Sequence, residues 1–290
     1  MANQSNPPRI NALSDISSAY DAILCDVWGV LHNGVQAFPT AHQSLSQYRQ
    51  SRSGAVVLVT NAPRPNPPIA LQLDDLGVAR SAYDQIVTSG DVTIDAILRT
   101  QGDKAYHLGP ERDRNIFDDL PISLVEADAA DFIVCTGLFD DITETPDDYR
   151  AEFERLVPKG LPMICANPDL VVHRGGQEVY CAGALAQLYE ELGGFVEING
   201  KPHAPIYRAA LERLKTVTPA PIEPSRILAI GDAFRTDVKG AVDAGFDCLL
   251  ITSGIHKNLF GPADQPEPTR VHEELAAAGL GAVAFMPTLA

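Results

Sequence analysis

The strongest constraint on the fold is a run of five apolar residues, Ala55–Val59, three of which are valine. An uninterrupted apolar run of this length, rich in β-branched residues, is typical of a strand buried on both faces of a parallel sheet. Further strand candidates occupy 22–25, 85–89, 226–230 and 248–251, and segments with helical spacing separate them. Strands that alternate with helices predict an α/β fold with a Rossmann-like parallel-sheet core.

A second, smaller series of strands and helices interrupts this core. From residue 104 to about 196 the alternation repeats in shorter units. A chain of 290 residues exceeds the usual single core, so a second domain is expected. The sequence therefore predicts a Rossmann-like core formed by 1–102 plus 197–290 and an inserted α/β domain over 103–196. We expect a loop at 170–177, and we expect the run at 248–251 to be the last strand.

Charge and composition limit the classes of partner. Thirty-eight acidic and 22 basic residues give a formal charge of −16, which repels nucleic acids and anionic lipid surfaces. Any anionic ligand therefore needs a local cation. The five cysteines are widely spaced without CxxC pairing, which favours buried thiols in a reducing compartment. No apolar run approaches the length of a membrane-spanning helix and the segment 1–11 is polar, so we expect a cytoplasmic chain that neither spans a membrane nor is secreted.

Polar side chains that could take part in binding or catalysis follow two of the predicted strands. Asp26 comes directly after the run 22–25, where open α/β sheets bind their ligands. Thr60 and Asn61 come directly after the run 55–59. Alternatives stay open for each: Asp26 could simply accept backbone N–H groups at a strand end, and Thr60 or Asn61 could cap the next helix.

The second half of the chain adds a cation and two carboxylates. Lys201 stands between a glycine and a proline, which fix the backbone around its ammonium group, although a surface lysine is the alternative. Asp232 follows an apolar strand and a glycine, and Asp237 lies about one helical turn later. Phosphoryl transfer needs oxygen ligands for a hard divalent ion, donors for phosphate oxygens and a neutralising cation. The ordered set of strand ends provides all three.

A loop in the inserted domain carries further candidates. Asn167 and Asp169 follow a predicted strand, and His173 and Arg174 precede two glycines. Such a loop could reach a neighbouring active site and bind substrate. The alternative is an Asn-Pro turn followed by a solvated His-Arg pair, and the residues alone do not decide between them.

These motifs, in this order, resemble the haloacid dehalogenase superfamily, and most closely its type IIA branch, which includes sugar-phosphate and nucleotide phosphatases. The resemblance runs from about Asp21 to Gly254. It rests on the segments 26–30, 59–61, 167–169, 183–184, 200–202 and 231–237. It implies a Rossmann-like core and makes the insert an α/β cap domain. No GxGxxG motif follows a predicted strand, so a dinucleotide-binding dehydrogenase is disfavoured.

The resemblance also implies roles for individual residues. Asp26 would attack phosphorus and form an aspartyl-phosphate. Asp26, the backbone carbonyl of Trp28 and Asp232 would bind Mg²⁺, with Asp237 supporting the metal site. Thr60, Asn61 and Lys201 would hold the phosphate, and Lys201 would also pair with the nucleophile.

One position departs from the family pattern. Family phosphatases usually carry a second aspartate two residues after the nucleophile, where this chain has Trp28. An indole donates a hydrogen bond but has no useful acid–base pKa, so it cannot protonate a leaving group or deprotonate water. Trp28 could pack near the sheet edge or line the substrate entrance.

Three functions follow as hypotheses. The first, which the sequence favours, is a Mg²⁺-dependent phosphatase of a small phosphorylated metabolite in which Asp169, His173, His32 or an acidic leaving group replaces the missing acid. The second is a phosphotransferase, because a slowly hydrolysed aspartyl-phosphate can meet another acceptor. The third is a catalytically weak phosphometabolite-binding or regulatory protein. The substrate and the oligomeric state stay open, with a homodimer as one candidate.

Overall fold

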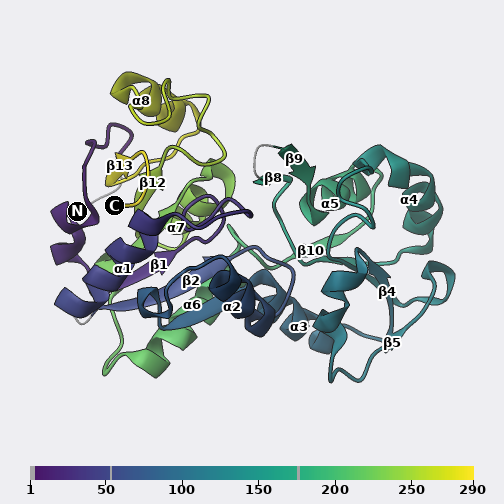
Figure 1. Ribbon diagram of the computed structural model, residues 1–290. Helices are drawn as coiled ribbons and strands as arrows, with labels where there is room; N and C mark the ends of the chain where they lie inside the picture. Colours follow the sequence, from purple (N-terminus) through teal and green to yellow (C-terminus); the bar gives the residue numbers. More distant parts are fainter. Residues whose placement is uncertain (1–3, 53, 175–176) are drawn as a thin grey trace. The chain divides into compact units, whose positions relative to one another are not determined.

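The computed structural model describes residues 4–52, 54–174 and 177–290 (Figure 1). The chain packs into two compact units. The first unit comprises 1–60, 70–87 and 207–290, and the second comprises 61–69 and 88–206. No helix within the described residues has the length and apolar character needed to cross a membrane.

A six-stranded sheet forms the centre of the first unit, in the order β13-β12-β11-β1-β2-β3. Neighbouring strands from β13 through β2 pair in parallel. All residues of β1, β2, β11 and β12 are buried, which confirms the expected strands with two covered faces. The strands are β1 (Ala22–Cys25), β2 (Ala55–Thr60), β3 (Gln85–Thr88), β11 (Ile227–Gly231), β12 (Asp247–Ile251) and β13 (Ala284–Met286).

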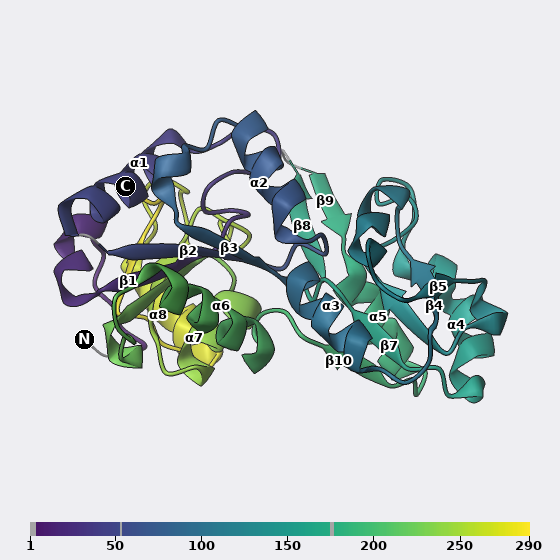
Figure 2. The same ribbon diagram turned by 90° about the horizontal axis from the view of Figure 1, so that it is seen from below.

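Helices cover both faces of this sheet. Helix α1 lies on one face, and α6 and α7 lie on the other (Figure 2). The helices lie on opposite faces because each crossover between parallel strands is right-handed. The chain moves from β1 to β2 in one direction across the sheet and from β11 to β12 in the other, so the connecting helices fall on different faces. The helices are α1 (Pro39–Arg52), α2 (Asn66–Asp75), α6 (Ala204–Val217), α7 (Lys239–Asp243) and α8 (Pro268–Ala277). Helices α2 and α6 begin in the second unit and end in the first.

The second unit contains its own parallel sheet, in the order β10-β7-β6-β4-β5. Its strands are β4 (Lys104–Leu108), β5 (Ser123–Leu124), β6 (Phe132–Cys135), β7 (Met163–Cys165) and β10 (Val196–Ile198). Its helices are α3 (Ser89–Arg99), α4 (Arg150–Leu156) and α5 (Ala182–Glu191). The two parallel sheets with their helices confirm the predicted α/β class.

Alternation along β6 shows how this second sheet is buried. Ile133 and Cys135 pack in a cluster with Phe153 of α4 and Tyr189 of α5. Phe132 and Val134 point to the opposite cluster, which contains side chains of α3. Because successive strand residues face opposite sides, a wholly apolar strand is needed here to fill both clusters.

Short helices complete the chain. The 3₁₀ segments are η1 (Leu13–Asp15), η2 (Ser17–Ala19), η3 (Arg80–Ala82), η4 (Glu111–Phe117), η5 (Ala127–Ala129), η6 (Pro146–Tyr149), η7 (Val157–Lys159) and η8 (Pro224–Arg226). A π-helical turn, η9 (Phe234–Val238), precedes α7.

Two expectations about secondary structure are wrong. The expected loop at 170–177 is replaced by an antiparallel pair, β8 (Val171–Arg174) and β9 (Gln177–Tyr180). Two β-favouring runs around a pair of glycines are a hairpin signal that the interpretation as a loop overlooked; Gly175 and Gly176 themselves lie outside the described residues. The last strand is β13, whose three residues are too short for a periodicity argument.

The division into a catalytic core and a cap stays a prediction. The second unit, as it packs, contains 88–102 and 197–206 in addition to the insert expected at 103–196. Residues 61–69, which follow β2 directly, also belong to it.

Candidate active site

Two carboxylates of the first unit lie at the direction change of its sheet, which is the point between β1 and β11 where the chain stops adding strands on one side and begins adding them on the other. Asp26 follows β1 and Asp232 follows β11, and these two strands are parallel neighbours. The backbone N–H of Asp26 donates to the carbonyl oxygen of Ile230 at 2.8 Å, which extends the pairing of the two strands by one residue. Asp26, Asp232 and Asp237 are buried, and each offers a carboxylate oxygen within 4.8 Å of the others.

Backbone groups hold the Asp232 carboxylate in place. The N–H of Ile255 donates to Asp232 Oδ2 at 2.7 Å. Gly29 and Gly254 leave room for the same carboxylate, because a Cβ on either would lie 2.3 Å or 1.8 Å from Asp232 Oδ2. Gly29 also adopts φ +86°, which side-chain-bearing residues rarely adopt. Glycine at these two positions therefore lets the backbone approach the Asp232 carboxylate closely.

Asp237 is oriented by the start of the helical turn that carries it. The N–H of Ala233 donates to Asp237 Oδ2 at 3.1 Å, and Asp237 lies within η9. A Cβ on Gly231 would come within 2.3 Å of the Asp237 side chain, so the end of β11 must lack one. The π-helical turn thus places a second carboxylate beside the end of the strand that leads to Asp232.

Trp28 and His32 belong to the turn that follows the Asp26 strand. Their rings meet edge to face with centroids 5.1 Å apart, and the N–H of Gly29 donates to the His32 carbonyl at 2.8 Å. His32 is buried, and burial lowers the pKa of its imidazole to about 4. Its Nδ1 accepts from the N–H of Gly34 at 2.9 Å. A neutral, buried imidazole does not favour His32 as the replacement for a missing general acid.

The second unit brings together four of the other predicted site residues, Asn61, Asn167, Asp169 and Lys201. The Asn61 amide nitrogen donates to Asp169 Oδ1 at 2.9 Å and to the Lys201 carbonyl at 3.3 Å. Its amide oxygen accepts from the Lys201 N–H at 2.7 Å. Asn167 Oδ1 accepts from the Asp169 N–H at 3.1 Å, forming a local turn. Lys201 is 4% exposed, so it is not the surface lysine considered as the alternative.

Thr60 is the last residue of β2 and is buried, and Asn61 follows it in the chain. The structure thus forms two clusters of predicted residues, each within one unit. Asp26, Asp232 and Asp237 form one, and Asn61, Asn167, Asp169 and Lys201 form the other. The roles of all these residues stay predictions.

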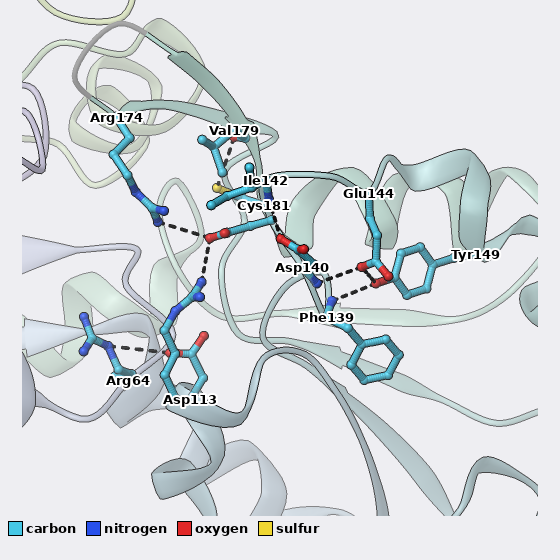
Figure 3. A network of polar contacts seen from close by, with 12 residues as sticks. Arg64, Asp113, Phe139, Asp140, Ile142, Glu144, Tyr149, Arg174, Val179 and Cys181 are labelled. Atoms are coloured by element: carbon cyan, nitrogen blue, oxygen red, sulfur yellow. Dashed lines mark hydrogen bonds and ion pairs between the residues drawn. The ribbon is translucent and has the colours of Figure 1, made fainter.

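His173 and Arg174 each have a carboxylate neighbour in the second unit. His173 Nε2 is 3.9 Å from a carboxylate oxygen of Glu178 across the β8–β9 pair. Arg174 donates to Asp141 at 3.1 Å (Figure 3), so the pair is not simply solvated.

Sequence reasoning missed several groups at these sites. The N–H of Ile255 and the small residue Gly254, which support Asp232, follow the strand next to β11. Residues that follow a buried parallel strand are expected near the ligand, and this argument, applied to β12, could have pointed to Gly254 and Ile255. It could not have found the bond between Asn61 and Asp169, because 108 residues separate these side chains in the chain.

A buried carboxylate also escaped notice. Asp113 is 3% exposed, and its carboxylate lies 3.6 Å from Arg64 Nε (Figure 3). Burial raises the pKa of Asp113 to about 6, although Arg112 and Arg64 oppose the shift. Because the folded pKa exceeds the unfolded value of about 3.9, its contribution to stability is fully present below about pH 4 and is lost as pH rises through 6.

We therefore expect Asp113→Asn to remove a pH-dependent cost of folding. The difference in unfolding free energy between variant and wild type should grow by about 3 kcal/mol between about pH 4 and pH 7. Urea unfolding at a series of pH values measures this difference. Asp147→Asn, which changes an exposed carboxylate paired with Arg150, is the control and should show no such growth. A constant difference for Asp113→Asn would contradict the account.

Comparison with known proteins identifies the family. The family profile described as haloacid dehalogenase-like hydrolase matches residues 23–123, and one described as HAD-hydrolase-like matches 198–278. A crystal structure of a hydrolase of the haloacid dehalogenase-like family from Brucella suis 1330 shares 44% identity. That match covers 98% of this chain and 100% of the other, with a TM-score of 0.87. The chain belongs to the haloacid dehalogenase-like hydrolases.

More distant relatives have named activities. The chain is 27% identical over 239 residues to the ribonucleotide monophosphatase NagD of Escherichia coli K12. The aligned part covers 80% of this chain and 88% of NagD. It also resembles the structure of a glycerol phosphate phosphatase from Mycobacterium tuberculosis in complex with magnesium. That structure shares 24% identity, covers 89% of this chain and 78% of the other, and has a TM-score of 0.63.

These matches confirm the family predicted from the sequence, including its type IIA relatives. They also confirm the predicted class of enzyme, a phosphoric monoester hydrolase of the haloacid dehalogenase type.

Proposed function

We propose that the chain is a Mg²⁺-dependent phosphatase that hydrolyses a small phosphorylated metabolite through an aspartyl-phosphate on Asp26. The observation that carries the proposal is the cluster of Asp26, Asp232 and Asp237 at the direction change of the first sheet. A carboxylate nucleophile and a metal-binding group at adjacent strand ends are the two parts that the reaction needs.

The donor set fits magnesium. Three buried carboxylates offer hard oxygen ligands within 4.8 Å of one another, and a cation between them would offset the repulsion of like charges. Asp26, Asp232 and the Trp28 backbone carbonyl would hold the ion, with Asp237 supporting Asp232. When bound, Mg²⁺ offsets negative charge on the phosphate, so that an anionic nucleophile can approach an anionic substrate.

The residues then have separate tasks. An Asp26 oxygen forms a bond to phosphorus while the bond to the leaving-group oxygen breaks, and that oxygen takes up a proton. Water then attacks phosphorus, loses a proton and releases inorganic phosphate, which restores Asp26. Thr60, Asn61 and Lys201 are proposed to bind the phosphate oxygens. Support for Lys201 comes from its burial and from the Asn61 amide that fixes its backbone.

Relatives suggest the class of substrate. The named activities of the two distant relatives are directed at a ribonucleotide monophosphate and at glycerol phosphate. Both substrates are small phosphate monoesters. We propose the same class for this chain, with the organic part of the substrate left open.

A second candidate function rests on Trp28. The side chain at this position offers no carboxylate for protonating a leaving group or activating water. An aspartyl-phosphate that hydrolyses slowly can pass its phosphoryl group to an alcohol acceptor, so the second candidate is a phosphotransferase. Support for either candidate would exclude the third hypothesis, a binding protein without turnover.

A phosphate-release screen over a panel of phosphate monoesters, with and without Mg²⁺, tests the proposal. Mg²⁺-dependent release supports the phosphatase. Release that is low in water but accompanied by a phosphorylated product when glycerol is added supports the transferase. Absence of both products with every substrate would overturn the enzymatic proposals.

We expect Asp232→Asn to weaken metal activation. Replacing one of few carboxylate ligands should raise the Mg²⁺ concentration for half-maximal activity by roughly tenfold or more, because an amide lacks the negative charge. A Mg²⁺ titration of phosphate release measures the shift. Asp243→Asn, on the exposed face of α7, is the matched control and should leave the midpoint unchanged. Equal midpoints for both variants would argue against Asp232 as a metal ligand.

A further inference from the structure

The second unit has a direction change of its own. The order of strands in its sheet is β10-β7-β6-β4-β5. Strand β5 therefore lies on one side of β4, and β6, β7 and β10 lie on the other. The chain therefore adds strands in one direction after β4 and in the other after β6. Open parallel α/β sheets bind ligands in the crevice outside the carboxyl ends of the strands at such a point. In the first unit, Asp26 and Asp232 occupy the corresponding place between β1 and β11.

Polar side chains from both strand ends meet at this point. Arg112, on η4 after β4, donates through Nη2 to Asp141 Oδ2, in the segment after β6, at 2.6 Å. At the strand ends themselves, His107 Nε2 lies 2.9 Å from Thr136 Oγ1. Arg174 of β8 donates through Nη2 to the same oxygen of Asp141 at 3.1 Å (Figure 3).

Sharing one oxygen leaves most of the donors of both arginines available. A guanidinium carries five N–H donors in a planar fork that matches carboxylate or phosphate oxygens. Across the described parts of the chain, Arg112 and Arg174 have no acceptor other than Asp141 Oδ2. Their side chains are 51% and 39% exposed, so a ligand from solvent can reach them.

Cationic groups gather at this place in an otherwise acidic chain. The chain carries 38 acidic and 22 basic residues, yet three guanidinium groups gather here, those of Arg64, Arg112 and Arg174. Asp113 and Asp141 are their direct carboxylate partners. The shared Asp141 oxygen brings the guanidinium groups of Arg112 and Arg174 to one place.

We propose that Arg112 and Arg174 bind an oxyanion group, phosphate or carboxylate, of a small metabolite at the direction change of the second sheet. Asp141 holds the two side chains toward each other and competes with the ligand for them. Both guanidinium groups present their remaining N–H donors to the oxyanion. The alternative is an ion-pair network that only joins η4 to the β8–β9 pair. This inference stands on the second unit alone and does not depend on the proposed phosphatase activity.

Calorimetric titration of the full-length protein without Mg²⁺ tests the site, with inorganic phosphate and succinate as separate probes. We expect Arg112→Gln and Arg174→Gln each to weaken binding of the preferred probe about tenfold, the size of effect expected for a charge-assisted hydrogen bond. Arg150→Gln removes an exposed arginine with a carboxylate partner in the same unit, and it should bind as wild type does. The stronger probe identifies the oxyanion.

Asp141→Asn separates binding from a purely structural role. Removing the competing charge should tighten binding of the probe roughly threefold or more, whereas loss of a structural ion pair would only lower stability. Thermal unfolding of each variant reports its fold, and Asp141→Asn decides the matter if an arginine variant does not fold. The inference is overturned if wild type binds neither probe, if binding survives unchanged in both arginine variants, or if Asp141→Asn does not bind more tightly.

Discussion

Replacing Asp26 with Asn should lower phosphate release by roughly 10⁴-fold or more, the order of loss seen when a covalent nucleophile is removed from an enzyme. The amide has nearly the same shape as the carboxylate, so the packing at the end of β1 is kept. It lacks the negative charge and the lone-pair reactivity needed to attack phosphorus. Asp26 is buried beside β11, and its backbone N–H already pairs with Ile230, so the substitution leaves the strand register intact.

Single-turnover kinetics with a labelled phosphate monoester measure this effect. Wild type should incorporate label into the protein before releasing phosphate, and Asp26→Asn should incorporate none. Asp74→Asn is the control, since this exposed carboxylate pairs with Arg80 in the first unit and should keep wild-type labelling and turnover. Turnover above about one hundredth of wild type in Asp26→Asn would exclude Asp26 as the nucleophile.

Strand-end reasoning from the sequence reached the cluster of carboxylates because its residues follow buried strands. Asp26 and Asp232 each come directly after an apolar run, and parallel strands place their carboxyl ends along one edge. Which strands are neighbours was not predictable from the runs alone. The adjacency of β1 and β11 joins a segment near the start of the chain to one in its last third, and it depends on packing of the complete sheet.

Other features depended on contacts that no local pattern encodes. Gly254 and the N–H of Ile255 support Asp232 from a loop that follows a different strand. The bond from Asn61 to Asp169 joins two turns of the second unit, each with an ordinary local explanation as a cap or an Asn-Pro turn. The shared oxygen of Asp141 brings together two arginines from η4 and β8, which are far apart in the sequence.

Trp28 gives the sharpest test of how this family member carries out hydrolysis. If the missing acid and base limits turnover, Trp28→Asp should raise phosphate release by about 10²- to 10⁴-fold, the usual contribution of general acid–base catalysis. The carboxylic acid would protonate the leaving oxygen, and the resulting carboxylate would take a proton from the attacking water. Trp28 is partly buried and its ring meets the His32 ring in an edge-to-face contact, so the smaller aspartate side chain fits within the space that the indole occupies.

Trp28→Asn is the matched control, because it removes the same indole and is nearly the same size as aspartate but cannot transfer a proton near neutral pH. We expect faster hydrolysis with Asp and little gain with Asn. Rapid-quench measurement of label lost from Asp26 locates the gain in the second step, where water attacks phosphorus. Equal rates in the two variants would mean that space at position 28, and not proton transfer, sets the rate. Unchanged label loss in a folded Trp28→Asp protein would show that another group already supplies the proton transfer, and the phosphotransferase candidate would then lose the observation on which it rests.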